Sequence, residues 1–235
     1  MVTNVNQTPF IKQLVANDKQ SRDSALESLR TYLSGRRDLT PIEILKLWKG
    51  LFYCMWMSDR PLAQQGLANS LAQLIFILPL ESVIPFLRGF WQTMQREWTS
   101  IDVLRMEKFL LLTRRYLAAS FEILKKHKWN ENLIQEMLLL LAEIPCNVAE
   151  LRVPNGIRYH IIDIYVDELE RLGYLEDGSE APIEQLLEPL RCLASKSPTK
   201  TVRIKAKETL KDKRLPEARK EDENNNNEEW EGFTD

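Results

Sequence analysis

Hydrophobic residues recur along most of this chain at steps of three and four positions, the spacing that places them on one face of an α-helix. One such stripe consists of Leu45, Trp48, Phe52 and Met55. No segment shows the strict alternation of apolar and polar residues that is typical of strands. The pattern predicts helices over 8–17, 20–34, 41–57, 61–78, 82–97, 101–126, 130–143, 157–172, 183–195 and 200–213.

Local signals for helix ends support this assignment. Thr40 precedes Pro41, and Glu43 follows three positions after Thr40. A hydroxyl at the N-cap, proline at the first helical position and glutamate at the third form a capping box with a preorganised first turn. Gly35 and Gly173 fall where predicted helices end, a common position for glycine.

Short connections and the absence of a predicted sheet favour antiparallel helix pairs that stack side by side. Successive pairs are spaced by roughly 40 residues, close to the HEAT and armadillo periods. We therefore expect an all-α protein, an irregular HEAT/armadillo-like α-solenoid, with a globular helical bundle as the alternative. The expected organisation is a helical-repeat domain over 1–195, a basic C-terminal helix over 196–216 that packs on or extends from it, and an acidic disordered tail over 217–235.

Charge is distributed unevenly although the net charge is only −2. The 196–216 segment carries eight basic and two acidic side chains, whereas 217–235 carries two basic and eight acidic ones. The second segment is polar and of low complexity, which predicts disorder. Trp230 and Phe233 lie within it and are candidate anchors for a protein partner. The acidic segment could also screen the basic segment until a partner displaces it.

Several basic pairs and clusters are candidates for contact with RNA phosphates. In the basic segment the spacing predicts a continuous cationic stripe opposite Val202, Ala206 and Leu210. Solvated surface, and complementation of the helix dipole at helix C-termini, are the alternative explanations for single pairs. The candidates are Arg36, Arg37, Arg114, Arg115, Lys125, Lys126, Lys128, Arg203, Lys207, Lys211 and Arg214.

A search for catalytic chemistry finds no phosphate-binding glycine loop, no nucleophile elbow and no metal-ligand spacing around His127 or His160. The three cysteines are widely separated and are expected to be small core residues in a reducing compartment. The chain also lacks a signal-peptide pattern or a membrane span. We expect a soluble intracellular protein that is not an enzyme, with no cofactor, no metal, no small-molecule substrate and no membrane partner.

One stretch, LWKGLFYCMWMSDRP at 47–61, closely resembles the signature of the nucleolar ribosomal-RNA-processing protein 1 family. Three further stretches are similar to that family in the same order, at 17–33, 88–117 and 153–172. The resemblance implies a helical, nuclear and nucleolar, non-catalytic factor in the maturation of the large (60S) ribosomal subunit. Its implied partners are other assembly factors and ribosomal proteins of the pre-60S particle, together with pre-ribosomal RNA contacted through its backbone.

Within the signature, the tryptophans and their apolar neighbours are expected to be buried. Lys49, Ser58, Asp59 and Arg60 are then left at the surface near a helix junction, as candidate protein-contact residues. Two other functions remain open from the residues alone. One is a general helical-repeat adaptor without a role in RNA biology, and the other is an RNA-processing enzyme, which would need a cluster of carboxylates or histidines.

Overall fold

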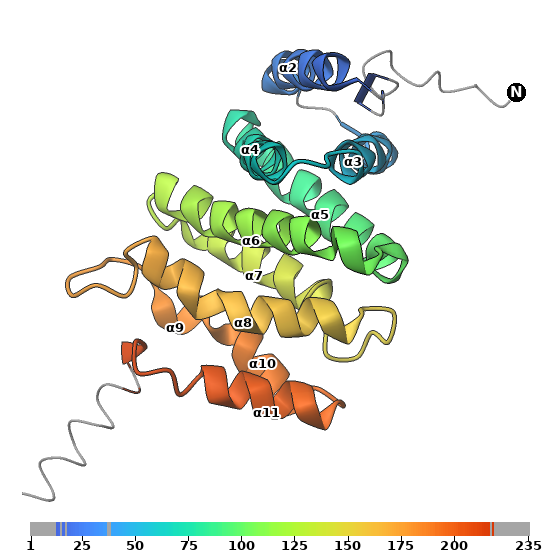
Figure 1. The fold of residues 1–235 in the computed structure, drawn as a ribbon. Coiled ribbons are helices and arrows are strands. Elements are labelled where there is room, and N and C mark those ends of the chain that lie inside the picture. Colours follow the sequence, from blue (N-terminus) through green and yellow to red (C-terminus); the bar gives the residue numbers. More distant parts are fainter. Residues whose placement is uncertain (1–12, 15, 17, 37–38, 217, 219–235) are drawn as a thin grey trace, which may run out of the picture. The chain divides into compact units, whose positions relative to one another are not determined.

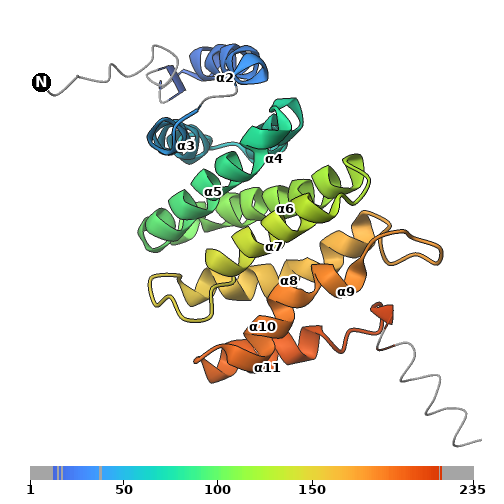
Figure 2. The same cartoon turned by 180° about the vertical axis from the view of Figure 1, so that it is seen from behind.

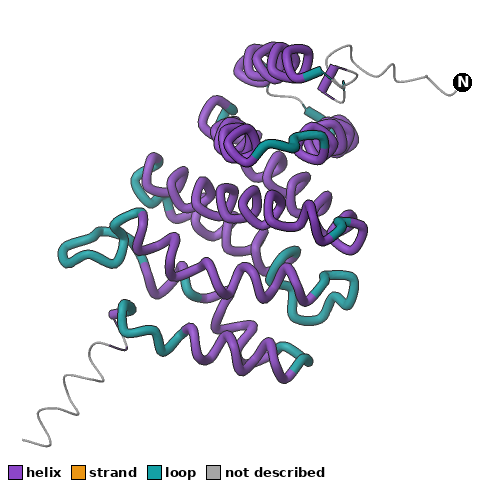
Figure 3. The backbone as a smooth tube through the Cα atoms, in the orientation of Figure 1, coloured by secondary structure: helices purple, strands orange, loops and turns teal. Residues whose placement is uncertain are grey.

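The computed structural model describes residues 13–14, 16, 18–36, 39–216 and 218. This part of the chain is built from helices and connecting turns and contains no strand (Figure 1 and Figure 3), so the predicted all-α class is confirmed. The α-helices are α2 (Lys19–Gly35), α3 (Pro41–Trp56), α4 (Pro61–Ala72), α5 (Leu80–Glu97), α6 (Val103–Lys126), α7 (Glu131–Glu143), α8 (Asn155–Arg171), α9 (Ile183–Leu186), α10 (Glu188–Lys196) and α11 (Lys200–Thr209), with 3-10 helices at Gln73–Ile77 and Trp98–Ser100.

The chain divides into two compact units, Met1–Ala119 and Ser120–Asp235, which are described separately. Helices α2 to α5 belong to the first unit and α7 to α11 to the second. Helix α6 begins in the first unit and ends in the second.

Several predicted helices are shorter or interrupted in the structure. The predicted helix over 61–78 ends as α4 and a 3-10 turn, because Leu78 precedes Pro79 and takes an extended conformation. The predicted helix over 183–195 is divided into α9 and α10 near Pro189, which lacks the backbone donor that a continuous helix needs. The predicted helix over 8–17 lies largely outside the described residues.

The predicted capping box at the start of α3 is confirmed. The Thr40 hydroxyl accepts a hydrogen bond from the backbone N–H of Glu43 (3.3 Å), and the Glu43 carboxylate accepts one from the Thr40 N–H (2.9 Å). The Thr40 hydroxyl also donates to that carboxylate (2.8 Å). These bonds from the backbone and side chain of Thr40 lower the pKa of Glu43, because they stabilise its charged form.

Substitution Thr40→Ala is expected to lower the free energy of unfolding by about 1 kcal/mol near neutral pH. A lowered carboxyl pKa gives stability that is complete above the ordinary pKa and is lost as the pH falls through the folded-state pKa. The difference between the protein and the variant should therefore narrow between pH 7 and about pH 3. Urea denaturation at both pH values measures this, and a constant difference would contradict the proposed contribution of Glu43.

The core of the first unit is organised around Trp48. Its ring centroid lies 4.9 Å from that of Phe86, 5.0 Å from that of Phe90 and 5.1 Å from that of Tyr116. The Trp48 indole donates a hydrogen bond to the carbonyl of Phe86 (2.8 Å). Such bonds allow a polar ring to be buried without loss of a hydrogen bond. Helices α3 and α5 therefore have a defined register.

The core of the second unit joins α6, α8 and α9. The rings of Phe121 and Tyr165 pack edge to face at 5.2 Å, and the Tyr165 hydroxyl donates to the carbonyl of Leu186 (2.6 Å). Helix α11 packs against both α8 and α10. Helices α9 and α10 lie behind α8 in Figure 1 and in front of it in Figure 2, which is the opposite view. Basic and acidic side chains of α11 and α8 are thus brought together.

Candidate functional site

The connection between α3 and α4, residues 57–60, lies at the end of the signature, and side chains of other helices bond to its backbone. The Lys108 ammonium group on α6 donates hydrogen bonds to the carbonyls of Trp56 (2.6 Å) and Ser58 (2.7 Å). Gln64 donates to the same Ser58 carbonyl (2.9 Å). The last carbonyls of a helix have no partner within it, so these side chains satisfy the end of α3. The connection is therefore rigidly attached to the first unit.

Lys108 itself is only 3% exposed. Its burial lowers the pKa of the ammonium group, and nearby Asp59 acts in the opposite direction. Sequence reasoning did not identify Lys108 as important. Its position among apolar residues of a long helix is a weak indication of burial. Its hydrogen-bond partners could not be inferred from the sequence, because they lie about 50 positions earlier in the chain.

The predicted protein-contact residues are only partly at the surface. Lys49, Asp59 and Arg60 are exposed, whereas Ser58 is buried at 5% exposure. The expectation that Ser58 lies at the surface is wrong, because the two hydrogen bonds accepted by its carbonyl draw the residue inward. The two aromatic candidates, Trp230 and Phe233, lie outside the described residues.

Apolar and aromatic groups flank this connection on α6. The Arg105 guanidinium lies 4.8 Å from the ring centroid of half-buried Trp56 and forms an ion pair with Asp102. The preceding Val103 and Leu104 are 88% and 92% exposed. Adjacent aliphatic side chains at this exposure are a feature of surfaces that bind other proteins. The end of α3 and the start of α6 thus form one mixed surface.

A groove of about 420 Å³ adjoins the other side of the connection. It lies within the first unit, between α2 and the start of α4, and its walls carry charges of both signs. The thiol of Cys54 lines it, but burial raises the pKa of this thiol to about 11, so it stays protonated. The lining residues are Lys19, Arg22, Asp23, Cys54, Met57, Ser58, Asp59, Arg60, Ala63 and Leu67.

The basic candidates of the first unit do not form an exposed cluster. Arg36 bonds to Glu43 (3.4 Å) and lies 5.2 Å from the ring centroid of Tyr32, while Arg37 is outside the described residues. Arg114 and Arg115 are half-buried within α6. Their role in RNA binding stays a prediction.

The basic C-terminal segment differs from the predicted continuous stripe. Helix α11 ends at Thr209, so Lys211 and Arg214 lie beyond it. The Arg203 guanidinium donates to the carbonyls of Ser197 (2.6 Å) and Pro198 (3.0 Å). The stripe is interrupted because arginine satisfies backbone carbonyls at the start of its own helix.

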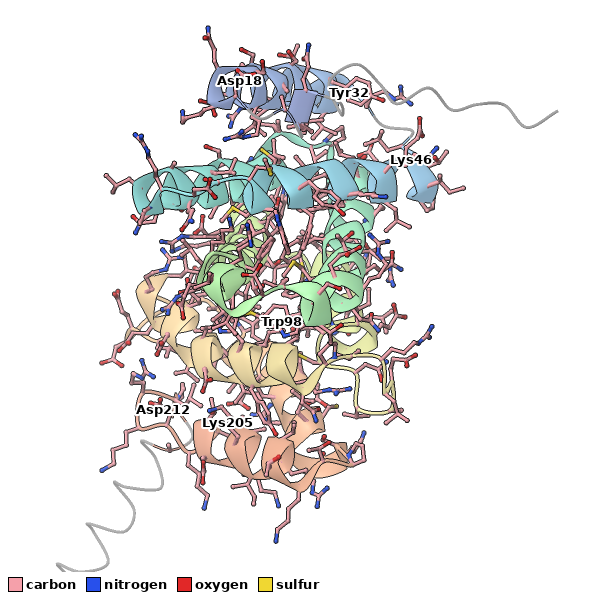
Figure 4. All side chains as sticks on the ribbon, turned by 45° about the vertical axis from the view of Figure 1, so that its right-hand side comes forward. Asp18, Tyr32, Lys46, Trp98, Lys205 and Asp212 are labelled. Carbon is pink, nitrogen blue, oxygen red and sulfur yellow. The ribbon has the colours of Figure 1, made fainter. Side chains whose placement is uncertain are left out.

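Arg214 is engaged by the acidic face of α8. Its guanidinium pairs with Asp167 (3.0 Å), Glu170 (2.6 Å) and Asp212 (2.7 Å), and these hydrogen bonds raise its pKa. Lys205 likewise pairs with Asp163. Figure 4 labels Lys205 and Asp212 on this side of the second unit. Three acidic residues of α8, Asp163, Asp167 and Glu170, therefore bind the basic segment. The neighbouring Glu168 is fully buried and pairs with Arg171.

The remaining RNA-contact candidates of the second unit fall into two groups. Lys207 and Lys211 are exposed on and after α11, near Ile204, which is 43% exposed. Lys125, Lys126 and Lys128 are exposed at the end of α6, as predicted for a cluster of lysines in a last helical turn. This second group adjoins two aromatic rings, those of Trp129 and Tyr174.

Among the residues that the structure describes, no group of three or more His, Cys, Asp or Glu side chains is placed to hold a metal ion. Cys146 is buried and its pKa is raised to about 12, whereas Cys192 is half-buried, so the expectation that all three cysteines are core residues is wrong for Cys192. In the same described regions, no helix has the length and hydropathy required to cross a membrane.

The described residues thus form an all-α protein, in which anchored helix ends display charged, aromatic and aliphatic side chains. The chain belongs to the Nop52 family, described as nucleolar protein Nop52, which it matches over residues 5–232. Membership confirms both the resemblance seen in the signature and the nucleolar location that it implied.

Curated relatives share this assignment. The chain is 43% identical over 185 residues to human Ribosomal RNA processing protein 1 homolog A, covering 74% of this chain and 39% of the relative. It is 40% identical over 203 residues to human Ribosomal RNA processing protein 1 homolog B, covering 82% of this chain and 26% of the relative. A Drosophila melanogaster homolog is 32% identical over 173 residues, with 69% and 24% covered. The chain thus spans less than half the length of these relatives.

Proposed function

We propose that this chain is a non-catalytic assembly factor of the large (60S) ribosomal subunit precursor, needed for processing of large-subunit pre-ribosomal RNA. In this proposal the helices form an irregular HEAT/armadillo-like solenoid that acts as a scaffold in nucleolar pre-ribosomal particles. The names of the relatives, which describe ribosomal RNA processing, support this assignment. Protein partners would be other assembly factors and large-subunit ribosomal proteins, and pre-ribosomal RNA would be contacted through its phosphates.

The observation that carries the proposal is the anchored connection between α3 and α4. Buried Lys108 and half-buried Gln64 hold its backbone, while Asp59 and Arg60 remain exposed. Val103 and Leu104 are exposed at the start of α6, the helix that carries Lys108. A preordered loop loses little conformational entropy when it binds, so its contacts contribute to affinity. Exposed charged side chains give such a surface specificity, and exposed aliphatic side chains give it apolar area that a partner can bury. A catalytic role would require none of these features.

Sedimentation of a tagged chain on density gradients tests this proposal. We expect the protein to co-sediment with large-subunit precursors, and the charge-reversed pair Asp59→Lys with Arg60→Glu to reduce the bound fraction about tenfold, as expected for contacts at the centre of an interface. The control pair Glu136→Lys with Lys196→Glu reverses the same charges at exposed sites in the second unit and should sediment normally. A parent protein confined to light fractions would refute the proposed function.

A further inference from the structure

The turn that follows α6 has an unusual backbone. The Lys128 N–H donates to the carbonyl of Lys125 (2.9 Å) and the Trp129 N–H to that of Leu124 (2.9 Å). This pair of bonds is a Schellman motif, in which the first residue after the cap takes a left-handed conformation and is usually glycine. Here that position is Lys128, with φ 53°, and the next residue, Trp129, also has a left-handed φ of 55°.

A left-handed conformation is unfavourable for a residue with a Cβ compared with glycine, and bulky side chains adopt it rarely. Strained residues of this kind persist when the surrounding structure holds them, and they concentrate at functional sites. The consequence for the side chains is specific. Lys128 is exposed next to Lys125, and Trp129 lies between the lysines and the second unit's core.

The ring of Trp129 is oriented by an aromatic neighbour. Its ring packs edge to face with that of Tyr174 at 5.1 Å, and the Tyr174 hydroxyl donates to the carbonyl of Phe121 (3.3 Å). The Lys125 ammonium group lies 5.1 Å from the centroid of the same Tyr174 ring. Tyr174 is 2% exposed, whereas Trp129 is half-buried. The indole is thus held against Tyr174, whose ring also contacts Lys125, and it remains partly exposed next to Lys128 in the chain.

We propose that Lys125, Lys128 and Trp129 bind single-stranded RNA, with a base stacked on the Trp129 ring and neighbouring phosphates contacted by the two lysines. Stacking on aromatic side chains within a cationic surface is the general means by which proteins hold unpaired nucleotides. Bases inside an A-form duplex are already stacked and cannot reach the ring. The assignment rests on the proposed function as the source of the RNA and adds the class of RNA and the residue that distinguishes it.

Helix-dipole complementation accounts for only part of this cluster. It explains lysines in the last turn of α6, including Lys125 and Lys126, but not a strained lysine after the helix end or an accessible tryptophan. An acidic protein segment would use the lysines and leave the indole without a role. The loop after Tyr174 carries Glu176, Asp177 and Glu180, all exposed. These carboxylates lower the local positive potential, so binding should be modest and strongly dependent on salt.

Fluorescence anisotropy with the full chain and a labelled, unstructured RNA oligonucleotide tests this. We expect Trp129→Leu, which keeps an apolar side chain against Tyr174, to weaken binding about five- to a hundredfold, the usual effect of losing one base–aromatic stack. Trp129→Phe should recover most of the affinity. A duplex RNA of the same length should bind the parent more weakly than the single strand.

Lys128→Gly separates binding from stability. Glycine relieves the left-handed strain, so the melting temperature should rise, whereas loss of one phosphate contact should weaken RNA binding and reduce the slope of log affinity against log salt by about 0.7. The control for the loss of one lysine is Lys46→Gly, an exposed position of α3 in the first unit that is labelled in Figure 4. It matches the change in charge and not the change in stability, since glycine destabilises a helix interior. This control should leave the affinity unchanged.

Three results would overturn the proposal: unchanged affinity in Trp129→Leu, equal binding of single-stranded and duplex RNA, or loss of affinity in Lys46→Gly equal to that in Lys128→Gly. Tighter binding of poly-glutamate than of RNA, insensitive to Trp129→Leu, would assign the cluster to an acidic protein partner instead. Sedimentation of Trp129→Leu with large-subunit precursors distinguishes failure of the RNA-site proposal from failure of the proposed assembly function. The proposed function survives if the variant still sediments with them, and it fails only if the parent does not.

Discussion

Substitution Arg158→Met is expected to lower the free energy of unfolding by about 3 kcal/mol, because several buried carbonyls would lose their hydrogen bonds to a charged donor. Arg158 is 6% exposed, and its guanidinium donates to the carbonyls of Asn147 (2.6 Å), Val153 (2.7 Å) and Glu150 (2.9 Å). It also donates to the Asn155 side chain (2.9 Å). Without it, the carbonyls of the connection between α7 and α8 lose their partners.

Urea denaturation monitored by circular dichroism measures the loss, and amide hydrogen exchange shows whether protection is lost first around residues 147–155. Arg152→Met is the matched control, because its side chain is 83% exposed and bonds mainly to Glu150. Exposed ion pairs contribute about 0–1 kcal/mol, so this variant should be nearly as stable as the parent. The free energy of unfolding of Arg158→Lys should lie between those of the parent and Arg158→Met or equal that of Arg158→Met, since one ammonium group cannot reach all these acceptors. Equal stability of the Arg158 and Arg152 variants would disprove the role of the network.

Substitution Gly89→Ala is expected to destabilise the first unit by about 2–3 kcal/mol, the range found when atoms are forced into a packed core. A Cβ at this position would lie 2.4 Å from Cγ2 of Ile44 and 2.7 Å from Cδ1 of Trp48. The Trp48 ring cannot move freely, because its indole is bonded to the Phe86 carbonyl and it packs against three other rings. Helices α3 and α5 would have to separate.

A loss of stability in Gly89→Ala would point to a steric clash, because alanine is otherwise more favourable than glycine in a helix by about 1 kcal/mol. Gly66→Ala supplies the comparison, since no atom lies within 4 Å of a Cβ built at this exposed position of α4. We expect Gly66→Ala to raise the midpoint of urea denaturation and Gly89→Ala to lower it. Stabilisation by both substitutions would mean that α3 and α5 are less closely packed at Gly89 than the structure indicates.

The sequence was sufficient to predict those parts of the candidate site that depend on residues close together in the chain. Lysines in the last turn of α6 were identified because helix periodicity and the helix end are both local features. Arg214 was assigned to an exposed stripe because its partners, Asp167 and Glu170, are 47 and 44 positions away. The strain at Lys128 and Trp129 could not be anticipated, since neither residue type indicates a left-handed backbone. Tyr174, which orients Trp129, likewise lies 45 positions further along the chain.

Periodicity, the capping box at Thr40 and the signature at 47–61 were sufficient for the helical class, most helix positions and the family. These features depend on interactions within about four residues, which recur whenever the local pattern recurs. Burial of Ser58, the anchoring role of Lys108 and the need for glycine at position 89 arose from partners on other helices. Arg158 instead anchors the connection that precedes its own helix, through carbonyls 5 to 11 residues earlier in the chain. Local preferences are the same for many arrangements of helices, so such contacts exist only once the helices have packed.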